Sequence, residues 1–166
     1  NQHHGYVVLG QSQIPFMQKL VQSAPQLSSS SAVVIVDDTP NHELESTFNQ
    51  ISSYLEGIIQ VIYSDSTLTG IICYPNDNRP WGYYNETCQF EADQVTLLFQ
   101  GSPYLSRRYD QIVVFRYNTD DGLQLEHDIS PYVASEEAQR LYVPDAHIDK
   151  TSPLPIRAAT MLDLAP

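Results

Sequence analysis

Positive charge is scarce in this sequence. Eight lysines and arginines stand against 20 aspartates and glutamates, and the formal net charge at pH 7 is −12. Nucleic acids and anionic membrane surfaces are bound by clustered basic side chains, and Arg107-Arg108 is too small a patch for either. We therefore expect neither of them as a partner.

Long apolar runs are also missing. No stretch approaches the 18 or more apolar residues of a membrane-spanning helix, so we expect no membrane insertion within this chain. No signal peptide is visible, and the sequence begins at Asn1 without a methionine. We interpret the chain as a processed form or an excised fragment, for example of a membrane-anchored or surface assembly.

Cysteine is limited to Cys73 and Cys88, and no C-x-x-C spacing or neighbouring histidine accompanies them. A zinc site is therefore not expected, and we expect no other metal and no cofactor. Two cysteines that flank a polar, aromatic loop favour a disulfide, although two separate buried thiols are the alternative. With so few lysines, a disulfide indicates an oxidising, extracytoplasmic compartment: periplasmic, secreted or on a surface.

The loop between the cysteines concentrates features that favour recognition. Its prolines, glycine and asparagines predict irregular structure, and it holds the only tryptophan. Large rings bring contact area at low entropic cost, so they are candidate anchors for a partner. The alternative is that the rings plug a small satellite core under the loop. The candidate contact residues are Arg79, Trp81, Tyr83 and Tyr84, and Asn85 is a candidate glycosylation site.

The first third of the chain predicts alternating strands and helices. Apolar, β-branched runs predict strands at 6–9, 32–36 and 58–63. Helical spacing of apolar residues predicts helices at 15–23 and 40–56, the second of which stops at glycine. This β-α-β-α-β order predicts an α/β fold, with a single-layer sheet that is parallel at its core and covered by two to three helices.

The rest of the chain predicts antiparallel additions to that sheet. Residues 67–73 follow a short turn and are expected to return beside 58–63 as a hairpin, and 118–122 is a second hairpin signal. Ser135 can cap a short helix. Length and composition predict one domain over 1–166, with an extended proline-rich tail at 144–166 that packs on the body. Further strands are expected at 94–100, 111–117 and 123–128.

Polar side chains follow the predicted parallel strands, at the edge where open α/β sheets bind ligands. They are Ser12 after the first strand, Asp37 and Asp38 after the second, and Asp65 after the third. This edge is therefore a candidate ligand site. The alternative is that these residues are helix caps and turn residues, as serine and aspartate often are.

Two local resemblances involve the same edge. The run Val33-Val-Ile-Val-Asp37-Asp38-Thr39-Pro40 resembles the opening of a response-regulator receiver domain, whose acidic pair binds magnesium after the first strand. Residues 5–65 resemble the nucleotide-binding half of a Rossmann-type domain, including the potassium-channel regulatory kind. The turn at 10–15 lacks the second and third glycines of the phosphate turn in that family. The second resemblance implies a Rossmann-like regulatory domain.

The main enzyme hypothesis is a resemblance to SGNH-type serine hydrolases or esterases. These enzymes have a Gly-Asp-Ser block after the first strand and an Asp-x-x-His pair near the end. This chain has Gly10-Gln11-Ser12 and Asp145-Ala146-His147, so both motifs depart from the family pattern. The resemblance implies that His147 takes a proton from Ser12 while Asp145 orients the imidazole. His127-Asp128 is a second possible pair.

We favour a non-catalytic, extracytoplasmic recognition or sensor domain over the hydrolase and Rossmann-like alternatives. Its expected partner is a protein, or a small-molecule or glycan ligand, and the loop between the cysteines is the expected contact element. A serine-directed probe would separate the classes, since it labels a hydrolase and leaves a binding domain untouched.

Overall fold

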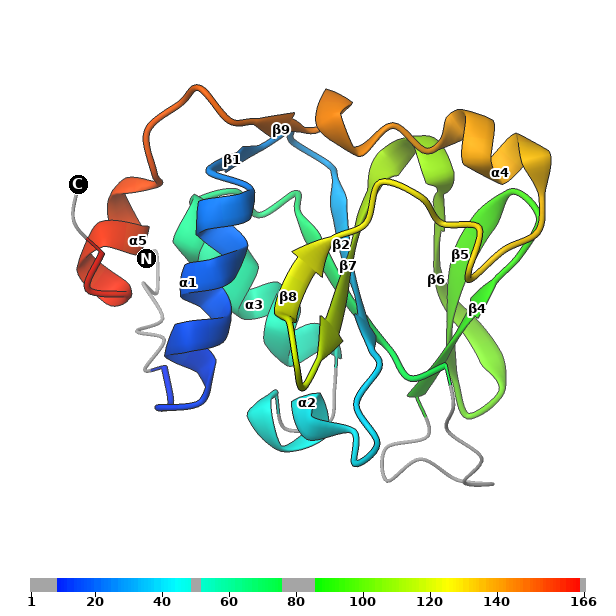
Figure 1. Ribbon diagram of the computed structural model, residues 1–166, viewed down its shortest axis with the longest axis horizontal. Coiled ribbons are helices and arrows are strands. Elements are labelled where there is room, and N and C mark those ends of the chain that lie inside the picture. The colour runs from blue at the N-terminus through cyan, green and yellow to red at the C-terminus, as the bar shows by residue number, and fades with distance from the viewer. Residues whose placement is uncertain (1–8, 49–51, 76–85, 165–166) are drawn as a thin grey trace, which may run out of the picture.

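The computed structural model describes residues 9–48, 52–75 and 86–164. Figure 1 shows a layered arrangement, in which a central sheet lies between a helical layer and a second sheet. None of the helices in these three ranges is long and apolar enough to cross a membrane. The helices are α1 (Gln13–Ser23), α2 (Glu43–Thr47), α3 (Ser52–Tyr63), α4 (Glu136–Leu141) and α5 (Ile156–Met161), with short 3-10 turns at Tyr109–Gln111 and Pro144–Ala146.

The central sheet has four strands in the order β3-β2-β7-β8. The first three are parallel to one another, and β8 pairs with β7 as an antiparallel hairpin. Helices together with parallel and antiparallel strands confirm the predicted α/β fold class. The strands are β2 (Ala32–Asp37), β3 (Thr69–Cys73), β7 (Ile112–Asn118) and β8 (Gly122–Leu125).

A second sheet of three antiparallel strands packs against the central one. Its order is β4-β5-β6, and the pairing of β5 with β6 shifts register between Leu97 and Leu98. A two-stranded pair, β1 with β9, lies at the amino-terminal edge of the central strands. These strands are β1 (Gln26–Leu27), β4 (Glu86–Phe90), β5 (Gln94–Phe99), β6 (Ser102–Arg108) and β9 (Ile148–Asp149).

Strand β2 lies at the centre of both hydrophobic cores, and all six of its residues are buried. Successive side chains of a strand point to opposite faces. Val33 and Ile35 therefore pack with α1 and α3, whereas Val34 and Val36 pack with the second sheet. The continuous apolar run at 32–36 thus has the burial expected of a central parallel strand.

The predicted strand at 58–63 is wrong, because these residues complete α3. Leu55, Ile58, Ile59 and Ile62 are buried at helical spacing, so one face of the helix covers the sheet. Gly57 does not end the helix; it lies within it. Tertiary burial of a complete apolar face outweighs the strand preference of isoleucine and valine.

The predicted hairpin at 58–73 is therefore also wrong. Residues 69–73 form β3, which runs parallel to β2 at the edge of the central sheet. The predicted helix at 40–56 appears as α2 and the start of α3, and residues 49–51 lie outside the described residues. The predicted strand at 6–9 also falls almost entirely outside them.

The later elements match the sequence more closely. The strands predicted at 94–100 and 111–117 are β5 and β7, and the hairpin signal at 118–122 joins β7 to β8. Ser135 caps α4, since its hydroxyl accepts a hydrogen bond from the Ala138 backbone N–H at 3.2 Å. The segment from 144 on is not extended throughout: it contains a 3-10 turn, β9 and α5.

Candidate binding cleft

Asp37 lies at the carboxyl end of β2, and its carboxylate holds the following chain. One oxygen accepts hydrogen bonds from the backbone N–H and the hydroxyl of Thr39, at 3.0 and 2.6 Å. The other accepts from the backbone N–H of Leu44 in α2, at 2.9 Å. Burial raises the pKa of Asp37, and these three donors oppose that rise. The geometry is that of a turn and helix cap, with both oxygens engaged.

Replacing Asp37 with asparagine should therefore lower the free energy of unfolding by about 1–2 kcal/mol. In either orientation of the amide, its NH2 group would face a backbone or hydroxyl donor. The matched control is Asp38→Asn, which removes the same charge from an exposed neighbour and should cost about 0.5 kcal/mol or less. Urea unfolding of both variants tests this, and equal losses would contradict the capping role.

Asp38 belongs to a charged group around Arg116. The Arg116 guanidinium lies 3.6 Å from the Asp38 carboxylate and 3.0 Å from that of Glu126. These three side chains line a hollow of about 430 Å³ beyond the carboxyl ends of β2 and β7, together with Tyr132. The guanidinium therefore already pairs with both carboxylates, and one net negative charge remains in the hollow.

The other two strand-edge candidates do not join this group. Asp65 lies at the opposite, amino-terminal edge, where its carboxylate accepts hydrogen bonds from Thr67 and from Ser29, which precedes β2. The Thr67 hydroxyl holds the pKa of Asp65 below its ordinary value. Ser12 begins α1 and lines a separate hollow with Tyr117. The structure therefore places Ser12, Asp37 and Asp38 at one edge and Asp65 at the other.

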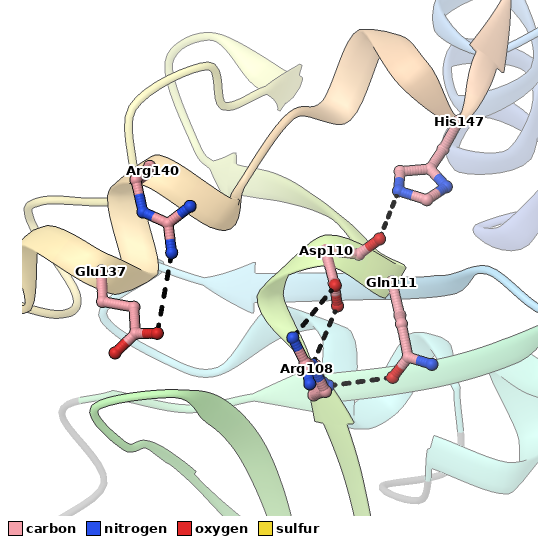
Figure 2. A network of polar contacts seen from close by, with 6 residues as sticks. All are labelled: Arg108, Asp110, Gln111, Glu137, Arg140 and His147. Carbon is pink, nitrogen blue, oxygen red and sulfur yellow. Dashed lines mark hydrogen bonds and ion pairs between the residues drawn. The ribbon is translucent and has the colours of Figure 1, made fainter.

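The hydrolase residues are not brought together. His147 lies at the amino-terminal edge, with its Nδ1 atom 3.2 Å from the hydroxyl of Ser31. Its Nε2 atom lies 2.9 Å from the Asp110 carbonyl oxygen, a contact that Figure 2 shows. Ser12 lies at the carboxyl edge, and the six residues of β2 that separate the two edges span roughly 20 Å. The predicted proton transfer from Ser12 to His147 is therefore wrong for this fold.

Asp145 also has different partners from those expected. Its carboxylate lies 3.1 Å from Nζ of Lys150 and 3.7 Å from Nε2 of His127. The hydrogen bond from Lys150 holds the pKa of Asp145 below its ordinary value. The Asp128 carboxylate accepts hydrogen bonds from the backbone N–H and hydroxyl of Ser130. His127 therefore faces Asp145 rather than its sequence neighbour.

The predicted disulfide is present, between Cys73 at the end of β3 and Cys88 in β4, with 5.3 Å between the Cα atoms. It joins the edge of the central sheet to the second sheet. Pro75 and Glu86, which flank the segment inside the loop, line two different hollows. The candidate contact residues Arg79, Trp81, Tyr83 and Tyr84 and the candidate glycosylation site Asn85 lie outside the described residues, so their roles stay predictions.

A cleft of about 380 Å³ lies between α3 and the second sheet, and we call it the α3 cleft. Leu97, Phe99 and Leu105 form much of its apolar wall. Tyr104 stands at the rim, with 73% of its surface exposed. The opposite wall is the polar face of α3, and Gly70 of β3 lies between the two walls. The lining residues are Ser52, Ser53, Glu56, Gly70, Glu86, Leu97, Phe99, Tyr104 and Leu105.

A tight turn sets the two aromatic side chains of the cleft. Gln100 and Gly101, between β5 and β6, both have positive φ, at 51° and 79°. Two successive positive φ values are the requirement of a type I′ hairpin turn, in which glycine is favoured at the second position. The turn joins the strand that ends at Phe99 to the strand that contains Tyr104. Backbone geometry therefore fixes both residues beside the same cleft.

The polar wall of the α3 cleft also closes the free edge of β3. The Ser52 hydroxyl accepts a hydrogen bond from the Ile72 N–H at 2.9 Å, and the Glu56 carboxylate accepts one from the Gly70 N–H at 3.3 Å. Glu86 accepts a hydrogen bond from the Ser52 N–H at 2.9 Å. Side chains of α3 thus replace the missing neighbouring strand, which protects this edge from pairing with another chain.

Sequence reasoning did not identify this cleft. Its lining comes from α3 and four strands, and α3 was expected to end before its second half formed. The turn Gln100-Gly101 between two apolar runs was a usable signal for a hairpin with aromatic residues on both sides. No sequence pattern indicates that Glu86 bonds to Ser52 or that Glu56 bonds to Gly70.

Neither a protein family model, nor a curated protein, nor a solved structure matches this chain. The described residues also contain no group of three or more histidine, cysteine, aspartate or glutamate side chains that could hold a metal ion. The function is therefore argued from the geometry of the α3 cleft.

Proposed function

We propose that this chain is a non-catalytic, extracytoplasmic recognition domain that binds its partner in the α3 cleft. The observation that carries the proposal is the gathering of exposed rings at the cleft. Tyr54, Phe99 and Tyr104 are the exposed aromatic residues of the described chain, and the last two line this one cavity. Exposed apolar and aromatic surface that is hollowed and rimmed by polar groups is typical of a binding site.

The rigid surroundings of the cleft support the same function. Both walls belong to regular elements, and the Cys73–Cys88 bridge ties β4 to β3, which both contribute residues to the cleft. A site that is held in shape before binding loses less conformational entropy when the partner arrives. The partner is a protein, or a small-molecule or glycan ligand of a size that fits the cavity.

The disulfide also supports an extracytoplasmic location, because such bonds persist in oxidising compartments. The loop that it closes is a second candidate contact element, through Arg79, Trp81, Tyr83 and Tyr84. Glu86, which follows the undescribed part of this loop, lines the α3 cleft. Pro75, which precedes it, lines the hollow around Arg116. A partner bound in the cleft would therefore lie next to the base of the loop.

The proposal is tested by screening the immobilised protein against a phage-displayed peptide library and a glycan array. We expect specific binders whose affinity falls at least about tenfold in the variant Phe99→Ala/Tyr104→Ala. The matched control is Ile156→Ala, which truncates a more exposed apolar side chain on α5 and should change nothing. Binders that ignore both cleft substitutions would place recognition on another surface.

A further inference from the structure

We propose that the α3 cleft takes a lysine side chain of a partner protein, with its ammonium group between Glu56 and Glu86. This inference rests on the proposed function, since it names the chemistry of the partner at the same cleft. It is carried by the position of the two carboxylates, by their hydrogen bonds and by the apolar wall that faces them.

The two carboxylates line the same cleft. Glu86 bonds to the backbone N–H of Ser52, and Glu56 is four residues further along the same helix. Glu56 in turn holds the Gly70 N–H of β3, so both carboxylates are anchored to backbone beside the cleft. A cation bound in this cleft therefore meets negative charge from both residues.

Each carboxylate has one oxygen left for a ligand. The Oε2 atom of Glu56 accepts from the Gly70 N–H, and the Oε2 atom of Glu86 accepts from the Ser52 N–H. Neither Oε1 atom has a hydrogen bond or an ion pair within the described part of the chain. The cleft therefore presents two separate carboxylate oxygens, which suits the compact ammonium of lysine. A guanidinium fork prefers both oxygens of one carboxylate.

Five cations of the described residues have partners outside the cleft. Arg108, Arg116, Arg140 and Lys150 pair with other carboxylates, as Figure 2 shows for Arg108 with Asp110 and for Arg140 with Glu137. The Arg107 guanidinium donates to the Ser106 carbonyl and to the hydroxyl of Thr69, the neighbour of Gly70. Within the described residues none of these ion pairs involves Glu56 or Glu86, so a partner can balance their charge.

The rest of the cleft matches the rest of a lysine. The apolar wall can cover the four-carbon stem, and the rings of Phe99 and Tyr104 can attract the ammonium through their faces. The free groups of the two glutamates are acceptors only, whereas lysine carries three donors and no acceptor. Lysine also neutralises negative charge in the cleft, which an uncharged sugar hydroxyl cannot do, so a glycan is the less suited occupant.

The experiment compares three blocked pentapeptides, each with alanine at both ends and leucine on either side of a central lysine, norleucine or arginine. Norleucine keeps the apolar stem and removes the ammonium. We expect the lysine peptide to bind in the cleft, by amide chemical shifts, at least about fivefold more tightly than the other two. The difference should shrink in high salt, because the partly exposed ion pairs are screened.

The matched variants are Glu56→Gln/Glu86→Gln and, as control, Glu137→Gln on α4. Glutamine keeps an oxygen for the Ser52 and Gly70 N–H groups, so the fold is retained while the charge is removed. The cleft variant should bind the lysine peptide as weakly as the norleucine peptide, and the control should bind like the unmodified protein.

Three results would overturn the lysine assignment: equal affinity for lysine and norleucine, unchanged affinity in the glutamine variant, or no saturable binding of the lysine peptide. Tighter binding of the arginine peptide would reassign the cation. A glycan array binder that depends on Phe99 and Tyr104 would also replace lysine as the occupant. None of these results decides whether the cleft is a recognition site. The library screen decides that separately, because binders that use the cleft lose affinity in the variant Phe99→Ala/Tyr104→Ala.

Discussion

Removing the Cys73–Cys88 bond with the variant Cys73→Ala/Cys88→Ala should lower the free energy of unfolding by about 3 kcal/mol. The bond closes a loop with a sequence separation of 15, and it joins strands of two different sheets. Without it, the unfolded chain gains freedom, and β4 loses its covalent tie to the central sheet. The loss is measured by urea unfolding at neutral pH, and coincident transitions by two probes establish two-state behaviour.

The control for this result is the unmodified protein under a reducing agent. Both proteins should lose similar stability, because both lack the bond. A larger loss of stability in the alanine variant would show that packing of the Cys73 side chain, which is 1% exposed, also stabilises the fold. The central sheet should persist in both, because its two cores lie mainly outside the loop. A loss below about 1 kcal/mol would contradict the expected contribution of the bridge.

Replacing Gly70 with alanine should lower the free energy of unfolding by about 2–3 kcal/mol, since overpacking forces a backbone shift. A Cβ atom at this position would lie 2.8 Å from the Glu56 backbone nitrogen and 2.9 Å from its Cα. Both atoms belong to the helix backbone, so no side-chain rotation can relieve the clash. The variant should also distort the α3 cleft, because Gly70 lies between its two walls.

Gly57→Ala is the matched control, and it should raise the free energy of unfolding rather than lower it. A Cβ atom at Gly57 would meet nothing within 4 Å, and the residue lies inside α3. Alanine restricts the unfolded chain and favours the helix, so we expect a gain of roughly 0.5–1 kcal/mol. Thermal unfolding of both variants measures the contrast. Destabilisation by Gly57→Ala, or tolerance of Gly70→Ala, would contradict the close approach of α3 to β3.

The fold class was predictable because the strongest local patterns agree with the packing. The run at 32–36 is apolar on both faces, as a central parallel strand requires, and 118–122 has the residues of a tight turn. The segment 58–63 misled the prediction because isoleucine and valine suit both a buried strand and a buried helix face. Its helical spacing, continuous with Leu55, was the better signal.

The site was predictable only in part. Cysteine spacing predicted the bridge, and the sheet-edge rule placed Ser12, Asp37 and Asp38 together at one edge. Asp37 is occupied by helix capping, however, and Asp65 lies at the other edge because the third parallel strand was assigned to the wrong segment. The α3 cleft depends on contacts between α3 and a hairpin 40 residues further on, which no local pattern encodes.

Recognition in the α3 cleft is tested most directly by mapping a bound ligand onto the amide spectrum of the unmodified protein. The ligand is the tightest binder selected from the peptide library or the glycan array. We expect the largest shifts at Gly70, Phe99 and Tyr104, with little change around Asp38 and Arg116. Shifts that gather at the Arg116 hollow, or anywhere away from α3 and the β5–β6 hairpin, would contradict the proposed function.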